Sequence, residues 1–222
     1  MRSSSGIAVT PANSLRSTTV MACVTLISRS LASVPLVLYE RNGDGRRTAE
    51  NHPLYSLLHD LANPLQTAME VRESLFANCL LYGNGYAEIE WGEDGYPVAL
   101  WPLPSDRIGV QITRDRQLVY TYYSDESRLV LLPKWRVHHM RGLAINGVLG
   151  MSPIREAMNA VGLDIAVEDF GSLYFGNGAR PSLVLSHPAK LTPEAMKNLR
   201  ASFEAQWSGL ETHTAWPSSA RA

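Results

Sequence analysis

The sequence predicts an α+β fold: helices with an antiparallel β-rich region, then a long projecting helix and a small α/β segment. Three patterns support this prediction. Apolar residues recur at helical spacing before residue 85. Apolar and polar residues alternate in short runs, separated by turns, between residues 85 and 140. A second helical pattern then extends from about residue 152 to residue 175.

The composition argues against several classes of function. Basic and acidic residues nearly balance, at 20 and 21 of 222, so the chain does not resemble a protein that grips nucleic acid by its phosphates. Its two cysteines, Cys23 and Cys79, both fall on apolar helix faces. We therefore expect buried free thiols in a reducing compartment, with a disulfide between them as the open alternative.

A first helix is expected from Ser14 or Ser17 to Ser33, after residues 1–13, a small and polar segment that is expected to be flexible. Five apolar residues at helical spacing predict its core-facing stripe: Val20, Val24, Ile27, Leu31 and Val34. A charged residue and a proline interrupt this apolar run, so it predicts no membrane span, and the chain is expected to be cytosolic.

Several short elements are expected next. A strand is predicted at residues 36–40, a turn at residues 42–45 and a short helix at residues 52–60. The helix at residues 67–82 begins with a capping box, because Glu70 stands three residues after a threonine cap.

The stretch LLYGNGYAEIE, residues 80–90, has a partial copy in YFGNG, residues 174–178. Each Gly-Asn-Gly run follows a helical pattern and precedes a strand-like one. A phosphate-binding loop needs the opposite order, strand before helix. We therefore interpret the glycines as helix stops. They are Gly83, Gly85, Gly176 and Gly178.

The long helix is predicted to begin at Ser152, a cap residue followed by proline, and to reach Phe175. One apolar stripe consists of Ile154, Met158, Val161 and Ile165. A second stripe, about 180° away on the helix, consists of Leu163, Val167, Phe170 and Tyr174. Either the helix is buried between two layers of one domain, or its second half leaves the domain and packs on a neighbouring subunit.

No catalytic residue, cofactor site or metal site is predicted. Residues 150–154 fail the nucleophile-elbow pattern because the last position is isoleucine. His138 and His139 are adjacent in a predicted strand and point to opposite faces, so one is expected in the core or an interface. Asp164 and Glu168 are spaced for acid–base work, but no third group accompanies them. The alternative that stays open is a phosphoesterase or nucleotide-binding enzyme using the Gly-Asn-Gly loops and histidines.

The end of the chain is predicted to contain a strand-like run at residues 182–185. A helix follows, capped by Thr192, ending near Trp207 and stopped by Gly209. Residues 211–222 lack periodicity and are expected to be a disordered tail.

Six stretches in order resemble the portal proteins of tailed bacteriophages, in the shorter of their common forms. They are SLRSTTVMACVTLISRSLASVPLVLYE, HPLYSLLHDLANPLQTAMEVRESLFANCLLYGNGYAEI, GYPVALWPLPSDRIGV, VHHMRG, GVLGMSPIREA and YFGNGARPSLVL. The resemblance implies a wing-like α+β domain at residues 14–151, a stem helix at 152–178 and a partial clip region at 179–210. The residues of both stripes then become candidates for subunit packing, and Asp164, Glu168 and Asp169 for an acidic stem surface.

The resemblance also implies partners and a location. Such proteins form a ring, usually of about twelve copies, at one capsid vertex. The ring is the channel through which double-stranded DNA is packaged and ejected without sequence recognition. It contacts the terminase large subunit, the capsid and head–tail connector proteins, and involves no membrane. The expected location is the virion, and the host cytoplasm during assembly.

The resemblance predicts a missing part. Members of the family continue through the rest of the clip, a second stem helix and a crown, whereas residues 211–222 do not resemble the family. We therefore expect a C-terminally truncated copy, as in a decayed prophage.

Overall fold

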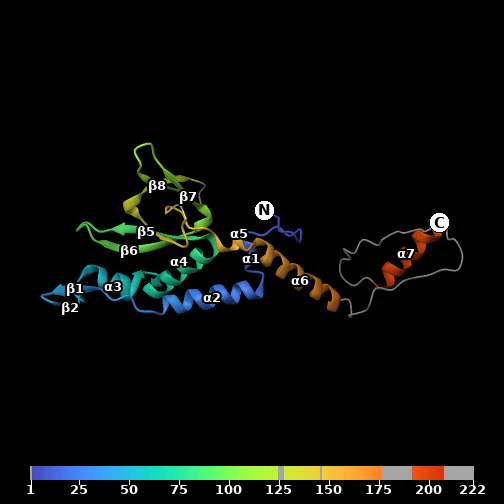
Figure 1. Cartoon of the computed structure of the whole chain (residues 1–222), viewed down its shortest axis with the longest axis horizontal. Coiled ribbons are helices and arrows are strands. Elements are labelled where there is room, and N and C mark those ends of the chain that lie inside the picture. The colour runs from blue at the N-terminus through green and yellow to red at the C-terminus, as the bar shows by residue number, and fades with distance from the viewer. Residues whose placement is uncertain (1, 125–127, 146, 177–191, 208–222) are drawn as a thin grey trace. The chain divides into compact units, whose positions relative to one another are not determined.

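The computed structural model describes residues 2–124, 128–145, 147–176 and 192–207. The chain divides into two compact units, Met1–Ile165 and Ala166–Ala222. The first unit combines helices with small antiparallel sheets (Figure 1). This arrangement confirms the predicted α+β class.

The first unit's helices lie before, between and after its strands in the chain. They are α1 (Pro11–Ser14), α2 (Thr18–Ala32), α3 (Pro53–His59), α4 (Ala68–Tyr82), α5 (Pro153–Glu156) and the beginning of α6 (Met158–Gly176). Short 3-10 turns, η1 (Ser105–Arg107) and η2 (Lys134–Arg136), precede two of the strands. The capping box predicted for α4 is present, with Thr67 as the cap.

The described strands pair only in antiparallel fashion. One sheet has the order β10-β5-β6, formed by Val137–Arg141, Asn84–Trp91 and Pro97–Leu103. A second sheet has the order β7-β8-β9, formed by Ile108–Ile112, Leu118–Tyr123 and Leu129–Pro133. Two hairpins complete the set: β1 (Tyr39–Asn42) with β2 (Gly45–Thr48), and β3 (Leu61–Asn63) with β4 (Gln66–Thr67).

Apolar side chains join these layers. α4 buries Val71 and Leu75 against Ala87 of β5, while α2 packs along α4 (Figure 1). The two three-stranded sheets share a second cluster, in which Tyr86 and Tyr120 are buried. Burial of such side chains is the main favourable contribution to folding.

Three backbones meet where α4 ends, at a contact formed by Gly83, Gly142 and Gly150 that we call the glycine junction. Gly83 has the left-handed conformation, with φ of 82°, that closes the last helical turn. The Gly142 N–H donates to the Gly83 carbonyl over 2.8 Å. A Cβ atom on Gly150 would lie 1.9 Å from that same carbonyl oxygen. No side chain larger than hydrogen fits there.

The other glycines of the two repeated runs do not behave alike. Gly85 was predicted to be a helix stop, but it lies inside β5, where a Cβ atom would come within 2.5 Å of the Leu75 carbonyl oxygen. It allows the strand to pass close to α4 and does not end the helix. Gly176 is the last residue of α6, and Gly178 lies outside the described residues.

The N-terminal segment was expected to be flexible, but residues 2–14 are folded. Ser3 and Val9 are buried, and Thr10 caps α1. A Cβ atom on Gly162 of α6 would lie 2.3 Å from the Ser3 hydroxyl oxygen, which shows how closely the segment approaches the helix. The small residues that suggested flexibility are the ones that permit this approach.

The predicted core stripe of α2 is wrong in its second half. Val20 and Val24 are partly buried, but Ile27 and Leu31 are 41% and 47% exposed. The helix buries Ser28 and Ala32 there instead, and Arg72 of α4 donates a hydrogen bond to the Ala32 carbonyl oxygen. Small side chains allow the close approach of the two helices, which rotates the larger ones outward.

The long helix predicted from residue 152 is interrupted. α5 and α6 are separated by Ala157, whose φ of −90° and ψ of 16° are not helical. The cap at Ser152 is as predicted: its hydroxyl accepts from the Arg155 N–H and donates to the Leu81 carbonyl oxygen over 2.6 Å. This second bond ties the start of α5 to the end of α4.

In the second unit, α7 (Pro193–Trp207) ends where the sequence predicts, and Thr192 Oγ1 accepts from the Ala195 N–H at its start. The predicted strand at 182–185, Gly209 and the tail at 211–222 lie outside the described residues. Among the helices that are described, none is both long and apolar enough to cross a membrane.

Replacing Gly150 by alanine should lower the free energy of unfolding by more than about 3 kcal/mol, because backbone atoms cannot move away from the new methyl group. The measurement is the urea unfolding midpoint at constant slope. Gly45→Ala is the control, since its Cβ atom would stand 3.7 Å from the nearest oxygen. Similar midpoints for the two variants would contradict the packing described for the glycine junction.

Candidate functional site

Asn84, the centre of the first Gly-Asn-Gly run, is a buried connector with 7% of its surface exposed. Its side-chain oxygen accepts from the Gly150 N–H over 2.8 Å and lies 3.0 Å from His139 Nε2. Its amide group donates to the Gly150 carbonyl oxygen over 3.0 Å. These bonds engage both polar atoms of the Asn84 side chain, so the loop fastens β5 to the segment before α5.

His139 belongs to the same network. The Tyr120 hydroxyl lies 3.1 Å from its Nδ1, and the ring lies 4.5 Å from that of Tyr86. Because Asn84 offers an oxygen to Nε2, the bonds assign the proton to Nε2 and leave Nδ1 to accept from Tyr120. Burial, with the charge of Arg141 and then His138, lowers the pKa of His139 to about 4. The ring is therefore neutral near pH 7, and it lies half-buried beside the core tyrosines Tyr86 and Tyr120.

No metal site was expected. Among the described residues, no three or more His, Cys, Asp or Glu side chains gather in a way that would hold a metal ion. Cys79 is half-buried and donates to the Met140 carbonyl oxygen over 3.3 Å, and burial raises the pKa of its thiol to about 11. Cys23 was expected to be buried but is exposed on α2. Both cysteines are free thiols, without a disulfide.

The first apolar stripe of α6 lies in the chain's own core. Ile154, Val161 and Ile165 are buried and Met158 packs against them. Residues from the N-terminal segment, α2 and α4 cover the stripe: Ile7, Val9, Leu15, Val20, Val24, Leu81 and Tyr82. Assigning this stripe to subunit packing is therefore wrong, because the N-terminal segment occupies the side on which a neighbour was expected.

The second stripe is uncovered. Leu163, Val167 and Phe170 are 59%, 61% and 69% exposed, and Tyr174 is 41% exposed. The rings of Phe170 and Tyr174 stack at 6.3 Å between centroids. Large apolar side chains exposed side by side typically mark a surface that another molecule covers.

The acidic residues of α6 differ in their surroundings. Asp164 accepts a hydrogen bond from the hydroxyl of Ser17, the cap residue of α2, so it joins two helices of the same chain. Its assignment to an acidic stem surface is therefore replaced by a structural role. Glu168 is half-buried and Asp169 is exposed, and these two keep that assignment as a prediction.

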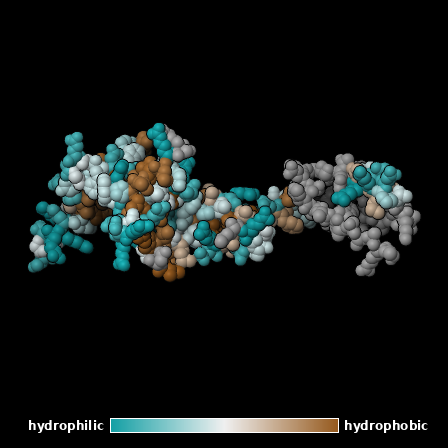
Figure 2. Space-filling model, turned by 90° about the horizontal axis from the view of Figure 1, so that it is seen from above, coloured by the Kyte–Doolittle hydropathy of each residue, from teal (hydrophilic) through white to brown (hydrophobic). Residues whose placement is uncertain are grey.

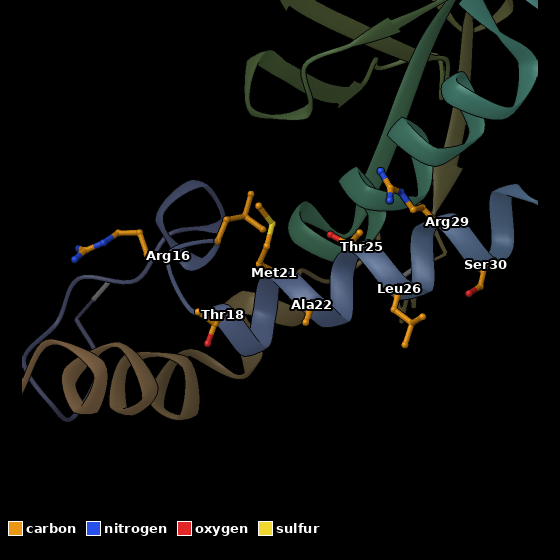
Figure 3. A pocket seen from close by; sticks show the side chains of 9 residues that line it. Arg16, Thr18, Met21, Ala22, Thr25, Leu26, Arg29 and Ser30 are labelled. Carbon is orange, nitrogen blue, oxygen red and sulfur yellow. The ribbon is translucent and has the colours of Figure 1, made fainter. Parts of the chain in front are cut away.

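A shallow groove of about 560 Å³ runs along α2. In Figure 3, Met21, Thr25 and Arg29 line one side of the helix and Ala22 and Leu26 the other. Leu26 is 69% exposed, so the groove is an open apolar face and not an enclosed reaction site.

A second apolar area lies over the β7-β8-β9 sheet. Figure 2 shows a hydrophobic band across the first unit. Exposed apolar side chains of this sheet are Ile112, Tyr123, Leu129, Val130 and Leu131. The described part of the chain therefore carries several apolar surfaces, and no assembled catalytic group accompanies them.

The family model for the phage portal protein matches residues 18–218. The chain belongs to the phage portal protein family. Both the family resemblance and the predicted fold class are thereby confirmed.

Two curated relatives support the assignment. The portal protein of Enterobacteria phage HK97 is 32% identical over 186 residues, which cover 83% of this chain and 43% of the relative. The probable portal protein of Streptomyces phage phiC31 is 27% identical over 216 residues, which cover 93% and 47%. The chain thus spans about half the length of the curated relatives it matches.

Solved structures show the same fold. A chain from the neck of an empty gene transfer agent particle, computed with C6 symmetry, has a TM-score of 0.63 at 26% identity. The match covers 88% of this chain and 55% of that one. The crystal structure of an HK97-family phage portal protein from Corynebacterium diphtheriae has a TM-score of 0.59 at 14% identity, covering 93% and 67%. At that identity the second comparison speaks for the fold alone.

The family match corrects one prediction. Residues 211–222 were interpreted as unlike the family, yet the match continues to residue 218. The segment contains small and polar residues without periodicity, so pattern alone carried no signal there. The enzyme alternative gains no support from the relatives, and Asn84 and His139 already bond to each other and to their surroundings.

The stability of this portal-family chain should fall as the pH decreases from about 6.5 to about 4. Unfolded His139 binds a proton near pH 6.5, whereas the folded protein resists protonation until about pH 4. The unfolded state therefore holds more protons in this window, which costs up to about 3 kcal/mol at its acidic end.

The measurement is urea unfolding at pH 7.5, 6 and 5 for the wild type and for His139→Gln. The variant should be less stable at pH 7.5 and should lose less stability on acidification. Parallel pH profiles would show that His139 does not cause the effect.

Proposed function

We propose that the chain is the portion of a portal subunit that contributes the wing, residues 14–151, the first stem helix, residues 152–178, and part of the clip, residues 179–210. In this proposal the subunits form a closed ring around a channel for double-stranded DNA at one capsid vertex. The observation that carries it is the uncovered second stripe of α6 in a member of the portal family.

The exposed stripe suits a ring. In a cyclic assembly one face of each subunit meets a different face of the next, so an apolar helix face finds its cover on a neighbour. The related neck structures were computed with C6 and C12 symmetry, which are cyclic symmetries. The packing residues on this side are Leu163, Val167, Phe170 and Tyr174.

The near balance of charge fits a DNA channel. A strongly basic lining would hold phosphates through released counterions and would resist sliding. Glu168 and Asp169 are the candidates for an acidic stem surface. No cofactor, catalytic step or membrane contact is part of this role. The partners are the terminase large subunit, the capsid and the head–tail connector proteins, in the virion and, during assembly, in the host cytoplasm.

The purified chain should self-associate through the second stripe. Val167→Asp and Phe170→Asp each place a charge where a neighbour would bury an apolar side chain, so each should weaken association at least about tenfold. Mass photometry and sedimentation over a range of concentrations measure this, and negative-stain images test for rings.

Ser172→Asp is the matched control, because this exposed residue lies on the face of α6 opposite the second stripe and gains the same charge. It should associate like the wild type. A wild-type chain that stays monomeric at all concentrations, or variants that associate unchanged, would remove the stripe as a subunit contact.

A further inference from the structure

A groove of about 470 Å³ on the first unit gathers three of the chain's five tryptophans. We call it the tryptophan groove and define it by Trp91, Trp101, Trp135, Glu88, Glu90 and Arg136. These residues come from β5, β6 and η2. Because the three elements are separated in the sequence, the cluster is visible only in the folded chain. Trp91 and Trp135 are 41% and 61% exposed, an unusual position for such large apolar rings.

The groove is held together by its own contacts. Trp101 Nε1 donates to Glu90 over 2.8 Å, and Trp91 Nε1 donates to the Trp135 carbonyl oxygen over 3.2 Å. The pairing of β5 with β6 shifts register between Glu90 and Trp91, and such bulges re-aim side chains. The indole N–H groups of Trp91 and Trp101 are therefore satisfied, and these two side chains offer a ligand ring surface beside carboxylates.

The charge of the groove is negative on balance. Glu88 and Glu90 stand two residues apart on β5, and Arg136 pairs with Glu88. The adjoining β5–β6 turn adds the exposed Glu93 and Asp94. Aromatic faces next to carboxylates suit a guanidinium group, which stacks on the ring and donates two parallel hydrogen bonds.

The β1–β2 hairpin presents the complementary chemistry. Arg41 and Arg46 are directly opposite in its register, on one face, and both are exposed. Like charges in that relation destabilise a hairpin unless something neutralises them. An ion pair joins Arg47 to Glu40 on the other face of the hairpin, while Arg46 lies 5.1 Å from the centre of the Tyr39 ring.

We propose that the tryptophan groove of one copy receives the Arg41–Arg46 face of the β1–β2 hairpin of a second copy. The carboxylates of Glu88 and Glu90 are about two strand residues apart, roughly 7 Å. The Cβ atoms of two directly opposed residues such as Arg41 and Arg46 lie about 5 Å apart, and long arginine side chains can spread to span the larger distance. Two different surfaces meet in this contact, which is the kind that a closed ring requires. The inference rests on the proposed ring and names a second contact, separate from the second stripe of α6.

Charge reversal with mixing tests the contact in the full chain. Arg46→Glu and Glu90→Arg should each weaken self-association at least fivefold, measured by mass photometry. Because the contact is between copies, combining both reversals in one chain should restore association. A mixture of Arg41→Glu/Arg46→Glu chains with Glu88→Arg/Glu90→Arg chains should regain the association that neither chain has alone, because each reversed surface meets a surface of opposite charge on the other chain.

A second mixture combines the wild type with chains that carry both reversals. A reversed hairpin fits only a reversed groove, so chains carrying both reversals should associate among themselves and exclude the wild type. Association of either single variant at wild-type strength, or a double variant no better than the singles, would overturn the proposal.

A binding measurement keeps this result separate from failure of the ring. A cyclised peptide with the sequence of residues 38–49 should quench the tryptophan fluorescence of the full chain in a saturable manner. Replacing both Arg41 and Arg46 by alanine in the peptide should weaken binding about tenfold, whereas Arg47→Ala, on the opposite face, should not.

If the chain is monomeric yet binds the peptide, the groove assignment stands without the ring. If it forms rings and the peptide does not bind, the groove assignment falls.

Discussion

The close approach of three backbones at the glycine junction is the constraint on which the rest of the first unit depends. Gly83 ends α4, Gly142 directly follows β10, and Gly150 precedes α5, so one contact fixes where three elements start or stop. Asn84 then fills the remaining hydrogen-bonding positions with its amide. The direction of α5 follows from these contacts, because its cap Ser152 bonds back to α4.

Local chemistry in the sequence predicted the elements well. The Thr67 cap, the Gly83 stop and the Ser152 cap depend on residues within a few positions, and the structure contains all three. Strand alternation likewise depends only on near neighbours. Predictions that depended on a residue far away in the sequence were less accurate. Which side of α2 is buried depends on how near α4 comes. The answer rests on Ser28 and Ala32, whose small side chains give little apolar signal.

The two stripes of α6 show the same division. Their spacing predicted that the halves of the helix need different partners, and the structure covers the first stripe and leaves the second exposed. The sequence could not tell which of the two stripes the chain itself covers. The answer depends on Ser3, which lies against Gly162 although the two residues are far apart in the sequence. The tryptophan groove was missed for the same reason: Trp91 and Trp135 meet only after the strands pair.

The unequal support along α6 has an elastic consequence. Its first half is held by packed side chains and by the Ser17–Asp164 bond. Farther along, no atom outside the helix's own backbone lies within 4 Å of where a Cβ on Gly171 would be, and after proline, glycine is the residue that most weakens a helix interior. A sideways force on this rod would meet a stiff base and a compliant point near Gly171, so bending would concentrate there and leave the base undeformed.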